Sequence, residues 1–233
     1  MKSGLRFLQG FLQGLRMSLD LLLGRRLALF AVADVVVVGW TLLAMLLESG
    51  DEPQAVYRQV VLVPFLILGL PALAGLVEVE RSAGCLDLAL SAPRVERYFL
   101  RRAAAVSLLL TLQGAALILI TWLKEDRWFP LLSCLGQVLV VSLFLGALSL
   151  FWAVRLKTAG GVWLASVATV GLLSRWFFHN PVPDRHFGVH QSLFPREEEL
   201  IQWAVSVAVL SAATVLLYFY ARRRLRRPET MIA

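Results

Sequence analysis

Apolar and polar positions follow one another along this chain in long blocks rather than in short periods. Six apolar runs, separated by polar or charged connectors, occupy residues 27–47, 60–77, 103–123, 131–154, 162–178 and 203–221. Because a bilayer core about 30 Å thick needs roughly 20 apolar residues per helix, each run is long enough for one crossing. The pattern predicts an all-α membrane protein with six transmembrane helices.

Residues 1–26 show a different pattern. Leucines recur at spacings of three and four at Leu5, Leu8, Leu12, Leu15, Leu19 and Leu22. A polar stripe recurs in the same way at Lys2, Arg6, Gln9, Gln13, Arg16 and Asp20. Two such stripes predict an amphipathic helix that lies in the headgroup layer, its basic side toward anionic lipid. The alternative is an early, frayed extension of the first span.

Composition agrees with a membrane protein. Of 233 residues, 58% are hydrophobic and only 17% are charged, whereas about a quarter of a soluble domain is charged. The six spans and their connectors leave no room for a separate soluble domain. The net charge is +7, and the Lys and Arg residues that produce it lie at the ends of apolar runs, as is usual in membrane proteins. Nucleic-acid binding is therefore not expected.

The distribution of the 23 Lys and Arg residues predicts the orientation. Seventeen lie in 1–26, 78–102, 155–161 and 222–227. The other six are Arg58, Lys124, Arg127, Arg175, Arg185 and Arg196. Because positive residues concentrate on the cytoplasmic side, both termini, loop 78–102 and a basic tail over 222–233 are expected in the cytoplasm. Segment 179–202 becomes the long outer loop.

Motifs for catalysis or nucleotide binding are absent from the sequence. Neither G-x-S-x-G nor H-E-x-x-H occurs, and there is no P-loop, so any ATP must bind another chain. Cys85 and Cys134 fall on opposite sides of the predicted membrane and are not expected to pair. His186 and His190 have the i, i+4 spacing of a metal site, but three prolines in their loop argue against a helix there. An intramembrane enzyme therefore lacks a catalytic constellation, and no metal is expected.

The most informative segment is the loop between the second and third spans. Its apolar cluster, Leu86, Leu88 and Leu90, is bounded by Gly84 and by Pro93, which disfavours helix at the residue before it. A short helix that breaks there would project leucines into the cytoplasm. Exposed leucines in such a position predict a protein partner.

Residues 80–93 read E-R-S-A-G-C-L-D-L-A-L-S-A-P and resemble the signature loop of ABC type-2 exporter permeases, roughly E-R-E-x-G-[ST]-L-[DE]-x-L-L-x-[ST]-P. Ser82 and Cys85 depart from that pattern. The layout resembles the family over nearly the whole chain, but sharp residue identity covers only about 78–102. The resemblance implies that a separate ATPase docks on Glu80, Arg81, Gly84, Leu86, Asp87, Leu88, Leu90 and Pro93.

The resemblance also implies the assembly. Two ATPase subunits would hold ATP and Mg, this chain would bind no cofactor itself, and it would pair with itself or with a related permease. The complex would move a substrate outward, or between leaflets, in a bacterial inner membrane. Two alternatives stay open: a haem-exporter-type permease of cytochrome c maturation, which also carries a glycine pair like Gly160–Gly161, and a non-transporting membrane scaffold. The sequence does not name the substrate.

Candidate pathway or gate residues are Asp34, Gln113, Gln137, Arg175, Phe187 and Phe194. Asp34 places a carboxylate within a span, where an ionised group is costly and often functional. It also suits a solvated or paired residue near the cytoplasmic end. The two glutamines suit hydrogen bonds between helices or plain packing. The arginine suits an anionic substrate or snorkelling to the interface. The two phenylalanines follow from the resemblance, in which the segment before the last span closes the outer leaflet.

Overall fold

The computed structural model describes residues 13, 32, 35–40, 42–43, 63–77, 95–124, 131–156, 158–178 and 197–227. Its long elements are the helices α4 (Val63–Ala74), α7 (Val95–Lys124), α8 (Leu131–Ala153), α9 (Ala159–Phe178) and α10 (Glu197–Leu225). Over the described ranges there is no strand. The prediction of an all-α chain is confirmed for this part of the molecule.

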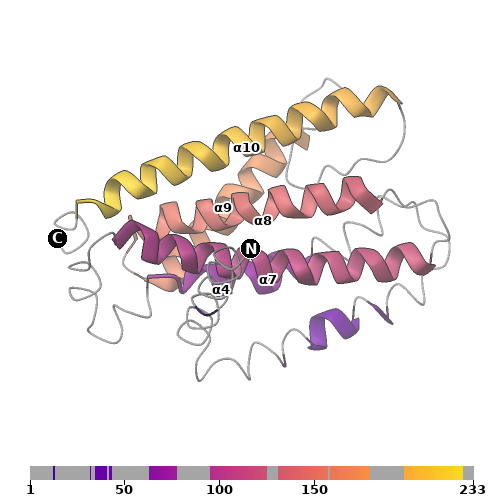
Figure 1. Cartoon of the computed structure of the whole chain (residues 1–233), viewed down its shortest axis with the longest axis horizontal. Coiled ribbons are helices and arrows are strands. Elements are labelled where there is room, and N and C mark those ends of the chain that lie inside the picture. Colours follow the sequence, from indigo (N-terminus) through magenta and orange to yellow (C-terminus); the bar gives the residue numbers. More distant parts are fainter. Residues whose placement is uncertain are drawn as a thin grey trace, which may run out of the picture.

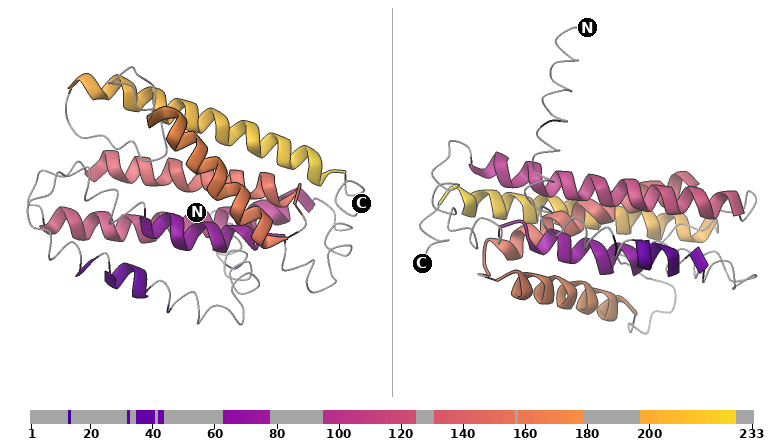
Figure 2. Two further views of the ribbon diagram at one scale, coloured as in Figure 1. Left: turned by 180° about the vertical axis from the view of Figure 1, so that it is seen from behind. Right: turned by 90° about the horizontal axis from the view of Figure 1, so that it is seen from below.

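Helix α8 is the centre of the bundle. It packs against α7 on one side and α10 on the other, and α9 and α4 also contact it. Figure 1 shows α7, α8 and α10 lying lengthwise beside one another, while α9 crosses them obliquely, as the view from behind in Figure 2 makes plain. The central position explains why every residue from Leu145 to Leu150 is buried. Further members of the buried core include Leu73, Leu76, Phe99, Ile118, Val138, Val141 and Phe144.

Successive helices run in opposite directions, so five helix ends meet at one end of the bundle. Arg102, near the start of α7, bonds the carbonyl of Leu76, just after α4. Arg155, just after α8, bonds Tyr220 near the end of α10. Helix α9 begins close by, because only a short turn follows α8 and Thr158 caps the next helix by accepting a hydrogen bond from the Gly161 amide at 3.1 Å.

Two helices extend beyond the apolar runs that predicted them. Helix α7 begins at Val95, eight residues before the predicted third span, and α10 covers Glu197–Leu225 where the run was 203–221. Loop 78–102 therefore ends in helix, as does loop 179–202, and the tail from 222 begins as helix. The extra turns are charged, and charges at both ends suit the helix dipole: Glu96 lies in the first turn of α7 and Arg222–Arg224 in the last of α10. At 1.5 Å per residue, α7 is about 45 Å long and exceeds a bilayer core.

Small residues let α7 and α8 approach closely. A Cβ added at Gly114 of α7 would stand 2.7 Å from Cγ1 of Val138, and one at Gly146 of α8 would overlap Oγ of Ser107. We call this contact surface between α7 and α8 the seam. Short hydroxyl side chains bridge it: Ser107 donates to the Ser142 carbonyl at 3.1 Å, and the Thr111 and Ser142 hydroxyls are 2.6 Å apart. Small residues and hydroxyls at helix contacts are typical of membrane bundles, where backbones must approach to gain packing.

The outer surface of the bundle is apolar as well as its core. Two described helical stretches, Val95–Leu123 and Cys134–Ala153, are long and apolar enough to cross a membrane. A core helix of a soluble protein passes the same criterion but is mostly buried. Here 67% of the apolar window of the second stretch is buried, as its central position explains, but only 44% of that of the first. Exposed side chains of the periphery include Leu108, Leu112, Leu119, Leu164, Leu172, Val209, Leu216 and Phe219. Soluble monomers rarely expose apolar surface on this scale, which favours a membrane environment.

Candidate functional site

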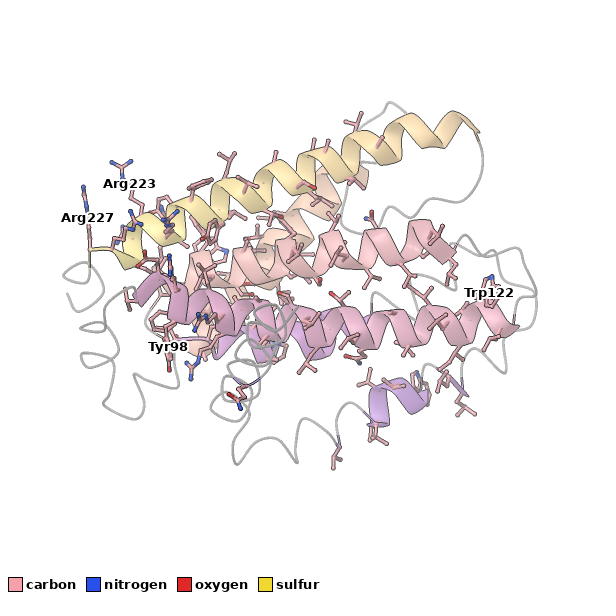
Figure 3. The ribbon with its side chains drawn as sticks, viewed as in Figure 1. Tyr98, Trp122, Arg223 and Arg227 are labelled. Atoms are coloured by element: carbon pink, nitrogen blue, oxygen red, sulfur yellow. The ribbon has the colours of Figure 1, made fainter. Side chains whose placement is uncertain are left out.

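Charged side chains gather at the end of the bundle where the five helix ends meet. We call this the arginine end, and its nine arginines are Arg97, Arg101, Arg102, Arg155, Arg222, Arg223, Arg224, Arg226 and Arg227. Figure 3 shows Tyr98, Arg223 and Arg227 at this end and Trp122 at the other. At the opposite end, the described helices contain Lys124 and Arg175 as their basic residues. The described bundle is therefore strongly polarised along its length.

Arg155 joins α8 to α10 at the arginine end. Its Nε and Nη2 both donate to the Tyr220 hydroxyl oxygen, at 3.0 and 2.6 Å. The guanidinium also lies over the rings of Phe151, 4.7 Å from the centroid, and Tyr220, 4.9 Å from the centroid. Two donated bonds and two aromatic faces hold this cation in one place, with cation–π attraction added to the hydrogen bonds.

Glu96 joins the start of α7 to the end of α10. Arg226 Nη2 lies 3.2 Å from its Oε1, and the Glu96 side chain is 13% exposed against 55% for Arg226. The pKa of Glu96 is held below its ordinary value of 4.5, first by a backbone hydrogen bond and then by Arg226 and the charge of Arg222. The carboxylate therefore stays ionised at neutral pH and ties together helices that are 130 residues apart in sequence.

Arg102 is the deepest charged residue that the structure describes and was not among the predicted site residues. Its side chain is fully buried, its Nη1 donates to the Leu76 carbonyl at 3.1 Å, and its guanidinium lies 4.9 Å from the ring centroid of Tyr98. The sequence carried a signal: Arg102 falls at helical spacing with the apolar residues Val95, Phe99 and Val106, which form one buried face. Reading this stretch as a loop concealed that periodicity.

A pocket of about 350 Å³ opens at the arginine end. It is lined by Tyr220, Arg223, Arg224 and Arg227, all from the last two turns of α10 and the residues just beyond. The lining carries three positive charges and one hydroxyl. Arginine presents a planar set of donors that matches carboxylate and phosphate oxygens, so the lining suits an anionic group.

Polar atoms also lie inside the bundle. Gln137 of α8 is completely buried, and neither its Oε1 nor its Nε2 has a hydrogen-bond partner within the described part of the chain; the same holds for Oγ of Ser149 and of Ser166. Gln113 of α7 is half-buried and has an interaction partner. Cys134, one turn before Gln137, is buried as a free thiol. Gln137 is thus the predicted pathway residue that the structure places deepest.

The other predicted residues are less fully placed. The docking set from Glu80 to Pro93 lies outside the described residues, as do Asp34, Phe187 and Phe194. The backbone of Arg175 lies in the last turns of α9, and its side chain is outside the described part. The residues that flank the docking segment are described: Leu76 and Val77 precede it, Val95 follows it, and both flanks are at the arginine end. Among the described residues, no group of three or more His, Cys, Asp or Glu is placed to hold a metal ion.

Comparison of the chain with protein-family models, with curated proteins and with solved structures gave no match in any of the three.

Proposed function

We propose that this chain is a six-span membrane permease of the ABC type-2 exporter kind, with both termini and the arginine end in the cytoplasm. A separate ATPase docks on the loop between the second and third spans, at Glu80, Arg81, Gly84, Leu86, Asp87, Leu88, Leu90 and Pro93. Two permease chains and two ATPase subunits form the complex, and ATP with Mg binds the ATPase.

The observation that carries the proposal is the polarity of the bundle. Its flanks expose aliphatic side chains, and nine arginines concentrate at one end, the arrangement that the positive-inside rule produces in a membrane protein. The docking segment leaves and re-enters the bundle at that same end, between Val77 and Val95. A loop anchored there lies on the cytoplasmic side in the proposed orientation, where an ATPase is accessible.

Transmission from the loop into the bundle has a direct physical route in this proposal. Arg102 clamps the end of α4 to α7 about two turns inside the point where the loop re-enters. Glu96 links the first turn of α7 to Arg226, just after α10. Movement of the docked loop therefore acts on α4, α7 and α10 together. Coupling requires an element with two arrangements that both sites bias, and the helix ends around Arg102 are the proposed element.

The polar contacts of the substrate path in this proposal come from Asp34, Gln113, Gln137 and Arg175. Phe187 and Phe194 of the outer loop close its outer end. Gln137 supports a polar path most directly, because an amide buried without a partner is costly in an apolar surrounding and gains from a ligand or water.

Co-purification tests the proposal. The tagged chain is extracted in mild detergent with its native membrane proteins, and bound ATPase and ATP turnover are measured for the wild type and for a Leu86→Asp, Leu88→Asp variant. A Met231→Asp, Ile232→Asp variant is the matched control, since it places the same charges on the proposed cytoplasmic side outside the loop. We expect ATPase with the wild type and the control and its loss from the loop variant. If no ATPase accompanies the wild type under any condition, the exporter is rejected and the membrane scaffold takes its place.

A further inference from the structure

The pocket at the arginine end continues an apolar stripe of α10. Leu216, Phe219, Tyr220, Arg223 and Arg227 occupy positions i, i+3, i+4, i+7 and i+11 and therefore share one face of α10 and its direct continuation. Leu216 is 69% exposed and Phe219 is 56% exposed, whereas the next residues along the stripe line the pocket. The face thus changes from exposed hydrocarbon to arginine within two helical turns.

This order along the helix, apolar side chains followed by arginines, matches the order of acyl chains and phosphate in a phospholipid. In a membrane, acyl chains lie beside aliphatic and aromatic side chains, and the phosphate lies one to two turns farther out, at the level where arginine and tyrosine gather. We propose that the pocket formed by Tyr220, Arg223, Arg224 and Arg227 binds the phosphate of an anionic phospholipid whose acyl chains run along Leu216 and Phe219. This inference depends on the membrane location in the proposed function, and it does not depend on the ATPase.

The chemistry of the lining selects phosphate. Arginine binds phosphate oxygens through two parallel N–H donors, and among the described residues three arginines at the end of α10 line the pocket. The Tyr220 oxygen already accepts two hydrogen bonds from Arg155, which leaves its own O–H proton to be donated to a phosphate oxygen. A headgroup with a net negative charge is favoured over a zwitterionic one, because a choline or ethanolamine cation would meet the arginines.

The size of the pocket agrees with a headgroup. At about 350 Å³ it is at the small end of ligand pockets, which range over roughly 300–1,000 Å³. It has space for a phosphate and a glycerol and no space for acyl chains, which must lie outside. The exposed surface of Leu216 and Phe219 supplies that outside contact.

The test measures lipid binding to the purified full chain in detergent. Native mass spectrometry and melting temperature are recorded with phosphatidylglycerol, with phosphatidylcholine of the same acyl chains, and with inorganic phosphate. The pocket variant is Arg223→Gln, Arg227→Gln, and the charge-matched control is Arg97→Gln, Arg101→Gln, two exposed arginines of α7 at the same end but outside the pocket. A second variant, Arg223→Lys, Arg227→Lys, keeps the charge and loses the planar donors.

We expect phosphatidylglycerol to bind the wild type and the control with closely similar affinity and to bind the Gln pocket variant about 25-fold more weakly, roughly fivefold for each arginine lost. The Lys variant should fall between them, and phosphatidylcholine should bind no variant with this preference. Equal loss in the pocket and control variants would show that charge at this end acts diffusely and would overturn the site. Equal binding of both lipids would overturn the phosphate contact, and binding of inorganic phosphate as tight as that of the lipid would overturn the acyl contact.

Failure of this inference is distinguishable from failure of the proposed function. A chain that binds phosphatidylglycerol through the pocket but recovers no ATPase keeps the lipid site and loses the exporter. A chain that recovers its ATPase but binds lipid equally in the pocket and control variants keeps the exporter and loses the lipid site. The Gln and Lys variants alter exposed side chains, and their fold is checked by circular dichroism and size-exclusion chromatography.

Discussion

The seam between α7 and α8 and the arginine end hold the bundle together through different interactions. In the seam, contact is dry and close: Gly114 meets Val138, Gly146 meets Ser107, and short hydroxyls bond across the gap. At the arginine end, long side chains reach over several ångströms of partly exposed surface, as Arg226 does to Glu96. Stability in the seam is therefore set by volume, whereas the arginine end is sensitive to salt, pH and ligands.

The difference has a functional meaning. A tightly packed seam keeps α7 and α8 together as one body, since interiors respond to the addition of a single methyl group. The ion pair of Arg226 with Glu96 rearranges at low cost, because ion pairs that reach the solvent contribute little net free energy. In the proposed exporter, motion starts at the arginine end and is carried by the rigid seam.

The largest effect is expected from adding volume to the seam. Gly114→Val should destabilise the bundle by about 3 kcal/mol, because its Cβ alone would stand 2.7 Å from Val138 Cγ1. Gly136→Val of α8 is the matched control, since nothing lies within 4 Å of a Cβ placed there. The free energy of unfolding of each variant is measured in mixed micelles with increasing dodecyl sulfate. Equal destabilisation by the two variants would show that valine acts through the helix backbone and not through the seam.

Removal of the buried arginine ranks next. Arg102→Ala should cost about 2 kcal/mol, because it removes a charged donor from the Leu76 carbonyl and the ring contact with Tyr98. Arg101→Ala, the exposed neighbour, should change stability by less than about 0.5 kcal/mol. The same unfolding measurement separates them. An Arg101 variant as unstable as the Arg102 variant would indicate that only the summed charge of this end matters.

A smaller effect is expected for the hydroxyls of the seam. Thr111→Val keeps the shape and loses the contact with the Ser142 hydroxyl, and should cost about 1 kcal/mol. Thr214→Val of α10 is the control, because that hydroxyl bonds the Leu210 carbonyl of its own helix. A double-mutant cycle of Thr111→Val with Ser142→Ala should give a coupling energy near 0.6 kcal/mol. Zero coupling would assign the effect of Thr111 to its own helix and not to the seam.

The smallest effect concerns the ion pair. Glu96→Gln should lower the melting temperature slightly at pH 7 and low salt, and the difference should shrink as salt screens the pair. Because the pKa of Glu96 is lowered in the folded protein, the carboxylate stabilises the fold above its ordinary value of 4.5, and this contribution disappears as pH falls through the lowered pKa. Melting curves of both proteins from pH 7 to 3 measure it. A difference that persists at the acid end would contradict a role for ionised Glu96.

The apolar runs of the sequence located helices better than they located helix ends. Helix α8 covers Leu131–Ala153 where the run covered 131–154, and a turn follows it directly. Helix α7 begins eight residues early, since Glu96, Arg97 and Arg101 are compatible with helix outside the apolar run. Arg226 pairs with the charge of Glu96, and the two arginines are exposed to water. The length of an apolar run indicates which residues are expected to face the hydrocarbon core of the membrane. It says little about where the backbone hydrogen bonding of the helix ends.

The candidate site was less accessible from sequence than the helices. Gln137 attracted notice as a polar residue in an apolar run, and its burial without a partner depends on neighbours that only packing assembles. Arg102 was hidden in a charged stretch, although its spacing from Phe99 and Val106 marks the buried face. The pocket needed the end of α10 to remain helical past the apolar run, so that Tyr220, Arg223 and Arg227 stack on one face.

The central claim, that the arginine end and the loop anchored on it face the cytoplasm, is tested most directly through Cys85. In a Cys134→Ser variant, Cys85 in the docking segment is the sole thiol of the chain. A membrane-impermeant maleimide is applied to right-side-out and to inverted membrane vesicles, and labelling of Cys85 is compared. We expect labelling in inverted vesicles and protection in right-side-out vesicles until detergent is added. Labelling of Cys85 from the outside of right-side-out vesicles would contradict the orientation, and with it the docking of an ATPase at the arginine end.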